Sequence, residues 1–267
     1  MHYNLIRSII FGTLFLTPGI ALAQDATDKS DKFSGYTTLG IAALPDYEGA
    51  DDLRILPLVD GKLFWDERYI AIEGPAIRAN VVNSETFEFG PIASVTFGRD
   101  DEIKDQAFAR LGEIDDAYEV GLFGAVNFDL GANDSLRLGV QGVQDVSDVH
   151  DGFVITANAT YTAPVGKRLT LMFDLGASYA SDDYAETYFS VTPAGTLASG
   201  LATFDAEGGF KDVGAQLTAT YLIDDNWGIA ANVGYRRLLG DFADSPVVSI
   251  GGNPDQLSGG LGVFFAF

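Results

Sequence analysis

The chain of 267 residues contains no cysteine and only two histidines, which excludes disulfide bonds and thiolate metal sites. Basic residues are also scarce, because 16 Lys and Arg stand against 38 Asp and Glu for a formal net charge of −22 at pH 7. This balance argues against nucleic acid as a partner, since its phosphates are met by Lys and Arg. The sequence has neither a glycine loop that cradles phosphate nor an H-E-x-x-H zinc motif, so it predicts no cofactor and no metal site.

Apolar runs long enough for a transmembrane helix are absent beyond residue 23. The first 23 residues have the layout of a cleavable secretory signal, in which Arg7 precedes an apolar stretch that ends at Ala21-Leu22-Ala23. We therefore expect export, a flexible periplasmic segment over residues 24–35, and one folded domain over residues 36–267. In a bilayer such a domain has to be a closed barrel, because only helices and closed barrels satisfy every backbone group in lipid.

Alternation of apolar residues with small or polar ones, the period of a β-strand, is the main pattern that the chain does contain. At the C-terminus one face carries Leu257, Leu261, Val263 and Phe265, while Gly260, Gly262 and Phe264 share the other. Three further segments that alternate in this way are 86–98, 153–162 and 168–179. The pattern predicts an all-β fold of antiparallel strands.

Short and long turns alternate along the chain, which is typical of a transmembrane β-barrel with short periplasmic turns and longer outer loops. Both termini of such a barrel in a Gram-negative outer membrane usually lie in the periplasm, so the strand count is even. Dividing the segment 69–82 at Gly74 and Pro75 meets this requirement, because Pro is tolerated at a bend and not inside a ladder. We therefore predict about twelve strands, with ten as the alternative.

Aromatic residues lie near the predicted strand ends, where a barrel places the rings that meet the membrane interface. Tyr161, Tyr221 and Trp227 flank short turns. The rings beside the long loops are Phe97, Tyr118, Tyr179 and Tyr235.

The long outer loops hold more than half of the 38 acidic residues, and two interpretations of this charge stay open. One is that carboxylates gather divalent cations that also bridge lipopolysaccharide phosphates. The candidates for this role are Asp51, Asp52, Asp100, Asp101 and Glu102. The other is a solvated acidic surface, which the lack of a D-x-D-x-D-G calcium loop favours.

The alternation also points a set of polar side chains into the barrel. The charged members of this set are Glu88, Glu119, Arg137, Asp174 and Arg236, and the amide members are Gln141, Asn158 and Gln216. Opposite charges that face a narrow interior pair with one another, so this lumen is either a small pore or a bonded plug.

Catalysis has little support, because acyl transfer by a serine needs an oriented base, which is usually histidine. Beyond the signal the chain has one histidine, His150, set among Ser147, Asp148 and Asp151 in an outer loop. Adjacency in sequence is not triad geometry, so we expect no enzyme and keep a rim hydrolase using His150 as the alternative.

Several strings match a known family. They include Pro45-Asp46-Tyr47-Glu48-Gly49, Leu56-Pro57-Leu58, the segment 111–117, and Gly234-Tyr235-Arg236-Arg237-Leu238-Leu239-Gly240-Asp241. With these motifs the chain resembles the MltA-interacting protein (MipA)/OmpV family of outer-membrane proteins from about residue 36 to residue 267. The family often has Ser where Arg236 stands.

The resemblance implies a barrel in the outer membrane that contacts lipid and lipopolysaccharide and carries no catalytic residue. The C-terminal strand, with Phe265 and Phe267, resembles the signal that the barrel-assembly machinery reads. The family's name implies a scaffold that joins a lytic transglycosylase to a bifunctional murein synthase. A small channel and a surface adhesin or stress-response barrel remain the alternatives, since the predicted periplasmic turns are short.

Overall fold

The computed structural model describes residues 33–99, 106–131 and 133–267. The predicted signal, residues 1–23, and residues 24–32 of the predicted N-terminal segment lie outside these described residues, as do Asp100, Asp101 and Glu102.

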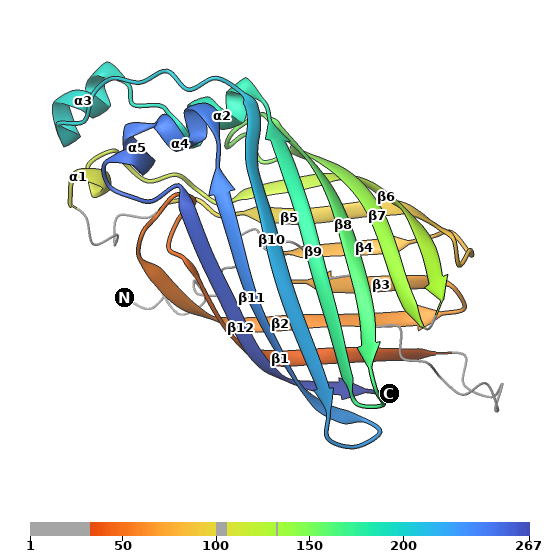
Figure 1. The fold of residues 1–267 in the computed structure, drawn as a ribbon. Helices are drawn as coiled ribbons and strands as arrows, with labels where there is room; N and C mark the ends of the chain where they lie inside the picture. The colour runs from red at the N-terminus through yellow and green to blue at the C-terminus, as the bar shows by residue number, and fades with distance from the viewer. Residues whose placement is uncertain (1–32, 100–105, 132) are drawn as a thin grey trace, which may run out of the picture.

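The described residues form a closed antiparallel barrel in which each strand pairs with the next along the chain and the last strand returns to the first (Figure 1). The strands are β1 (Ser34–Pro45), β2 (Leu53–Trp65), β3 (Arg68–Glu73), β4 (Ala76–Asn80), β5 (Phe87–Thr96), β6 (Ala117–Gly131), β7 (Asp134–Asp145), β8 (Phe153–Val165), β9 (Leu169–Ala180), β10 (Gly209–Leu222), β11 (Trp227–Leu238) and β12 (Asp255–Ala266). The prediction of twelve strands is confirmed, and the division at Gly74 and Pro75 is where the structure turns from β3 to β4.

Short helices occupy the long loops at one end of the barrel, which we call the loop end; the opposite end, which carries the short turns, is the turn end (Figure 1). These helices are α1 (Gln106–Ala109), α2 (Asp182–Phe189), α3 (Pro193–Ser199), α4 (Gly240–Asp244) and α5 (Pro246–Ser249). None of the helices in the described part of the chain is long and apolar enough to cross a membrane. Helices α2 and α4 pack over the mouth through Phe189 and Phe242, whose ring centroids are 5.1 Å apart.

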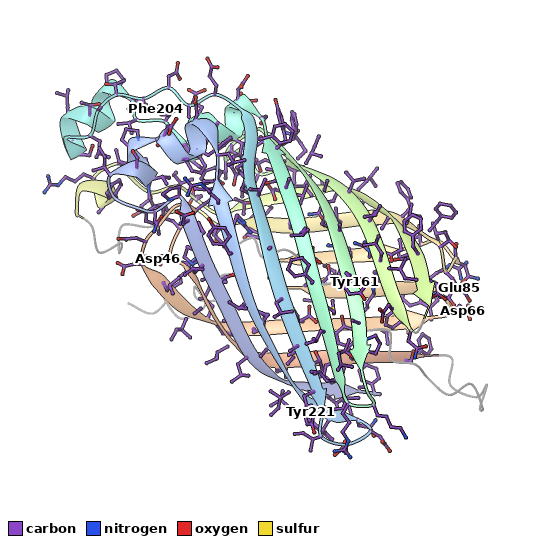
Figure 2. All side chains as sticks on the ribbon, viewed as in Figure 1. Asp46, Asp66, Glu85, Tyr161, Phe204 and Tyr221 are labelled. Atoms are coloured by element: carbon purple, nitrogen blue, oxygen red, sulfur yellow. The ribbon has the colours of Figure 1, made fainter. Side chains whose placement is uncertain are left out.

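Side chains alternate between the two faces of the barrel wall as the sequence predicts. In β12, Leu257, Leu261 and Val263 point outward and are more than half exposed, whereas Phe264 is buried in the lumen. Outward tyrosines such as Tyr161 lie toward the strand ends (Figure 2). The wall therefore presents an apolar outer surface with aromatic rings near its edges, as a lipid environment requires.

One sector of the wall is lower than the rest, because β3 and β4 are short and turn at Gly74, whose φ is +57°. The ladder between β2 and β3 covers Asp60 to Trp65, so residues 53–59 of β2 pair only with β1. Phe97, just after β5, packs into this sector against a buried cluster. The cluster consists of Ala42, Leu44, Leu56 and Leu58. The prediction of Phe97 as an outward interfacial ring is therefore wrong: the missing wall leaves apolar side chains that this ring covers.

Candidate functional site

Charged side chains of both signs fill the middle of the lumen and form what we call the lumen belt. Its members are Lys62, Glu73, Arg78, Glu88, Arg137 and Asp174, all nearly buried. Each comes from a different strand, in order β2, β3, β4, β5, β7 and β9. They meet in the lumen because alternation turns every second residue of a strand inward. Burying this many charges is tolerated only where each is paired or hydrogen-bonded.

Five of the six belt charges have such a partner, and the sixth, Lys62, lies over an aromatic ring. The guanidinium of Arg137 lies 2.9 Å from Glu88, which also accepts hydrogen bonds from the Tyr69 hydroxyl at 2.6 Å and from Asn127 at 2.9 Å. Arg78 and Glu73 form an ion pair at 2.7 Å. The belt thus contains two buried ion pairs of opposite charges, which is the pairing expected of charges that face a narrow interior.

Two more contacts complete the belt. The Lys62 ammonium lies 3.6 Å from the centroid of the Tyr69 ring, a distance at which the ring attracts the cation. Asp174 accepts a hydrogen bond of 2.5 Å from Thr160. Each contact joins a charged group to a side chain of the neighbouring strand, β2 to β3 for Lys62 and β9 to β8 for Asp174.

Below the belt, the turn end is closed by apolar side chains. Tyr36, Met172, Phe264 and Ala266 form a buried cluster there, and the rings of Tyr36 and Phe264 stack with centroids 5.5 Å apart. Phe64, Leu222 and Ala230 pack against this cluster. The lumen therefore has an apolar cluster at its turn end and paired charges at its middle.

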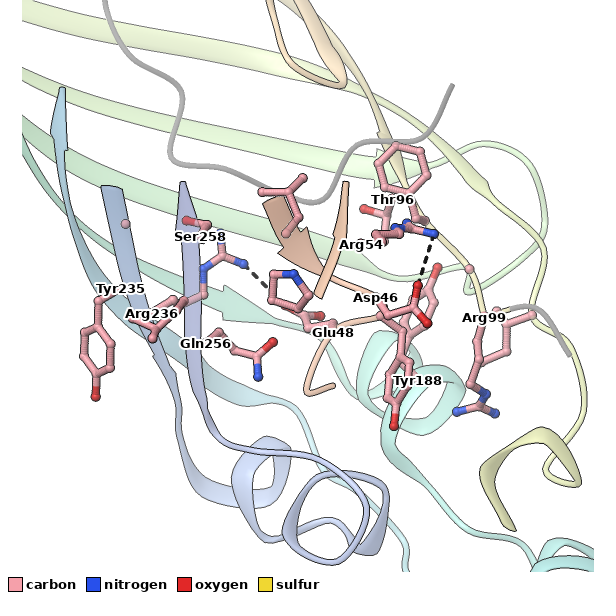
Figure 3. A pocket seen from close by; sticks show the side chains of 18 of the residues that line it. Asp46, Glu48, Arg54, Thr96, Arg99, Tyr188, Tyr235, Arg236, Gln256 and Ser258 are labelled. Carbon is pink, nitrogen blue, oxygen red and sulfur yellow. Dashed lines mark ion pairs between the residues drawn. The ribbon is translucent and has the colours of Figure 1, made fainter. Parts of the chain in front are cut away.

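At the loop end the lumen opens into a cavity of about 940 Å³, counting the part that is open to solvent, which we call the loop-end pocket (Figure 3). Its wall includes the charged residues Asp46, Glu48, Arg54, Arg99 and Arg236, the rings of Tyr47, Phe97, Tyr184 and Tyr188, and the amides of Gln216 and Gln256. Three of the chain's 16 basic residues meet in this one cavity.

The pocket floor is organised by Glu48, which belongs to the loop between β1 and β2. That loop folds back over the mouth, where the Gly49 amide donates to the Gln256 side chain at 3.2 Å. Glu48 accepts hydrogen bonds from Lys211 at 2.5 Å and from the Tyr184 hydroxyl at 2.8 Å. Arg236 lies 3.7 Å from the same carboxylate.

Burial leaves donors on the other side of the pocket without acceptors. Arg99 is 8% exposed, and burial lowers the pKa of its guanidinium from the ordinary value. Its Nε, the Nε of Arg54 and the hydroxyl of Tyr188 have no hydrogen-bond partner in the described residues. Burial also raises the pKa of Tyr188, so this hydroxyl keeps its proton. Figure 3 shows Arg54, Tyr188 and Arg99 around Asp46, with Arg236 and Glu48 across from them.

The residues of the alternative hydrolase site do not form a catalytic arrangement. Ser147 donates its hydroxyl hydrogen bond to Asp145 at 2.6 Å, and His150 Nε2 lies 3.3 Å from Glu119. The other ring nitrogen of His150 accepts a hydrogen bond from the Gly152 amide at 3.0 Å. Both ring nitrogens of His150 thus hold its loop, and within the described residues the Ser147 hydroxyl is bonded to Asp145 and not to His150.

The structure divides the predicted lumen residues between two levels. Glu88, Arg137 and Asp174 lie in the lumen belt, whereas Glu119 and Arg236 lie toward the loop end with His150 and with Glu48. Groups of three or more metal-ligating side chains do not occur within residues 33–99, 106–131 and 133–267.

Sequence reasoning missed Lys62, Glu73 and Arg78 of the belt and Glu48 and Arg99 of the pocket. The signal for Lys62 was obscured because both faces of β2 carry apolar residues near its loop end. Glu48 and Arg99 lie in loops, where alternation gives no direction for a side chain.

A model of the protein family described as MltA-interacting protein MipA matches residues 38–267. Among curated proteins, one of Escherichia coli (strain K12) named "Putative outer membrane protein YiaT" is 29% identical over 104 residues, which cover 39% of this chain and 42% of YiaT. The outer membrane protein OmpV of Vibrio cholerae serotype O1 is 32% identical over 126 residues, which cover 45% of this chain and 48% of OmpV. The matched segments span less than half the length of these relatives.

Two solved structures align with most of this chain at low sequence identity. The NanC porin has a TM-score of 0.43 at 9% identity and covers 87% of this chain and 98% of its own. An outer membrane channel from Pseudomonas putida F1 has a TM-score of 0.46 at 12% identity and covers 90% of this chain and 99% of its own.

Proposed function

The chain belongs to the MltA-interacting protein MipA family of outer-membrane proteins, and on that premise we propose that it is a closed barrel that presents binding surfaces at the two faces of the membrane. The chain lies in the outer membrane, as its named relatives do. Such a barrel either conducts solutes through its lumen or binds partners at its ends.

The lumen belt is the observation that carries the closed state. A water-filled channel keeps its charged lining hydrated, whereas Arg137 and Glu88 are each 9% exposed and bonded to one another at 2.9 Å. Moving such a pair apart exposes two charges to a narrow apolar interior, which is costly. The apolar cluster of Tyr36 and Phe264 adds a second barrier below it.

Planar lipid bilayers test this proposal directly. The purified, folded barrel is expected to give no discrete conductance steps under voltages at which a porin of known conductance, added as the control, gives steps. Steady steps from the unmodified barrel would contradict the closed state and establish the small channel in its place.

The family's description supports a partner for the periplasmic face, and we propose that the barrel binds MltA, a lytic transglycosylase, there and that a bifunctional murein synthase joins the same assembly. The described surface available to them is small. It consists of the exposed turns at the turn end, of which the one around Asn83 and Glu85 is among the broader.

Crosslinking in whole envelopes followed by purification of the barrel tests the partner. Replacement of residues 83–85 by Gly-Ser-Gly is expected to reduce recovery of the transglycosylase, whereas Leu197→Ser, in the exposed helix α3 at the opposite end, is the matched control. Equal recovery from both variants, or no transglycosylase with the unmodified barrel, would remove this role. Either result leaves the conductance test unaffected.

A further inference from the structure

The loop-end pocket holds a surplus of hydrogen-bond donors on one side. The Nε atoms of Arg54 and Arg99 and the Tyr188 hydroxyl are buried and have no acceptor among the described residues. A buried donor without an acceptor is unfavourable, and native proteins rarely keep several together without a use for them. Acceptor oxygens of a bound molecule would satisfy all three.

The charge of this half of the pocket also favours a ligand with acceptor oxygens. Arg99 is buried, and no carboxylate in the described part of the chain forms an ion pair with it. Arg54 does face Asp46, but at 3.8 Å, which is longer than a hydrogen bond. Guanidinium groups hold their donors in a fixed plane that matches phosphate and carboxylate oxygens.

The three donors also come from three different elements. Arg54 lies at the start of β2, Arg99 follows β5, and Tyr188 lies on α2. All three residues line the cavity, and in Figure 3 they lie around Asp46. Donors that approach from separate directions suit a tetrahedral phosphate, whose oxygens point several ways, better than a planar carboxylate.

Apolar contacts complete the lining. The ring of Phe97 lies under the Arg54 guanidinium, 5.9 Å from its centroid, and Tyr47 adds a second ring to the wall. This is also the sector in which β2 lacks a neighbour beyond β1 over residues 53–59. The pocket therefore offers apolar surface next to its cationic donors.

We propose that the loop-end pocket binds a phosphate monoester that carries an apolar group, with the phosphate on Arg54, Arg99 and Tyr188 and the apolar group against Phe97. Two sources have this chemistry: a free phosphate ester outside the cell and the phosphorylated headgroup of an outer-leaflet lipid. The inference goes beyond the closed-barrel role, because it assigns a ligand to the loop end and requires neither conductance nor a periplasmic partner.

Substitution of Asp46 tests whether the ligand is an anion or a cation. Its carboxylate lies beside Arg54, so it repels an anion that binds there and attracts a cation. Asp46→Asn is therefore expected to tighten binding of a phosphate ester by about threefold, whereas a site for cations would lose affinity. Arg99→Gln is expected to weaken binding by about tenfold or more, the scale of a charge-assisted hydrogen bond.

Isothermal titration of the folded barrel in a neutral detergent measures these effects with three probes: inorganic phosphate, phenyl phosphate and lipid A in mixed micelles. We expect phenyl phosphate to bind more tightly than inorganic phosphate if the free ester is the source, and lipid A alone to bind if the lipid is the source. Arg237→Gln is the matched control, because Arg237 points out of the barrel and is half exposed. Its affinities should equal those of the unmodified barrel.

Failure of all three probes to bind the unmodified barrel would overturn the proposal. So would equal affinities of the Arg99→Gln and Arg237→Gln variants, or weaker binding by Asp46→Asn. If Arg99→Gln does not fold, as judged by its migration in unheated gels, the Asp46→Asn result still decides the sign of the ligand's charge.

Discussion

Replacement of Arg137 by methionine removes one partner of a buried ion pair in the lumen belt. Arg137 and Glu88 are 2.9 Å apart, and each side chain is 9% exposed. Methionine keeps most of the apolar length of arginine and removes the charge. The variant therefore leaves the Glu88 carboxylate buried without its cation, while the packing around it changes little.

The expected loss of unfolding free energy depends on the hydrogen bonds that Glu88 keeps in the variant. Removing one partner of a buried ion pair typically destabilises a protein by about 3–5 kcal/mol, because the other charge stays buried. Glu88 keeps hydrogen bonds from Tyr69 at 2.6 Å and Asn127 at 2.9 Å, which places the expected loss near the lower limit of that range. A second substitution, Glu88→Gln, removes the stranded charge, so the double variant should recover more than half of the loss.

Unfolding of the barrel by guanidinium in detergent micelles measures these differences, with the fluorescence of Trp65 and Trp227 as the signal. Arg237→Met is the matched control, because the Arg237 and Asp255 side chains are 49% and 41% exposed at 2.6 Å from one another. Surface pairs contribute little, so this variant should unfold close to the midpoint of the unmodified barrel. Equal losses from Arg137→Met and Arg237→Met, or no recovery in the double variant, would refute a dry, paired lumen.

Two other predictions concern how the barrel closes and assembles. Gly40 lies in the seam between β1 and β12, where an added Cβ would meet the backbone carbonyl of Leu261. Gly40→Ala should therefore lower the guanidinium concentration at the unfolding midpoint. Gly209→Ala is the control and should leave the midpoint unchanged, because a Cβ at position 209 has open space. Phe267→Ala should reduce the amount of folded barrel in outer membranes, measured by unheated gels, if the C-terminal rings of Phe265 and Phe267 are read during assembly; an unchanged amount would remove them as the signal.

Alternation along the chain was sufficient to predict the strands, because each buried or lipid-facing position repeats every second residue. Alternation predicted that Phe264 faces the lumen. The turn at Gly74 was predicted because Pro75 favours a bend there and because a bend there makes the strand count even. Alternation failed at Phe97, because the short β3 and β4 remove the wall that would have held this ring outside.

The pocket could not be predicted in the same way. Glu48 reaches the lumen because its loop folds back onto Gln256, a contact between residues more than 200 positions apart. Short helices such as α2, which carries Tyr184 and Tyr188, fill the mouth and have no strand periodicity. Tertiary contacts of this kind leave no periodic trace in the sequence.

In a closed barrel of the kind we propose, water reaches the loop-end pocket but not the lumen below the belt. Because the chain has no cysteine, one introduced thiol reports on one position. Ser258→Cys, at a partly exposed position in the pocket, and Ala230→Cys, beside the turn-end cluster, can be treated on intact cells with a membrane-impermeant thiol reagent. We predict rapid labelling at position 258 and no labelling at position 230. Comparable rates at both positions would show a continuous aqueous path and contradict the closed barrel.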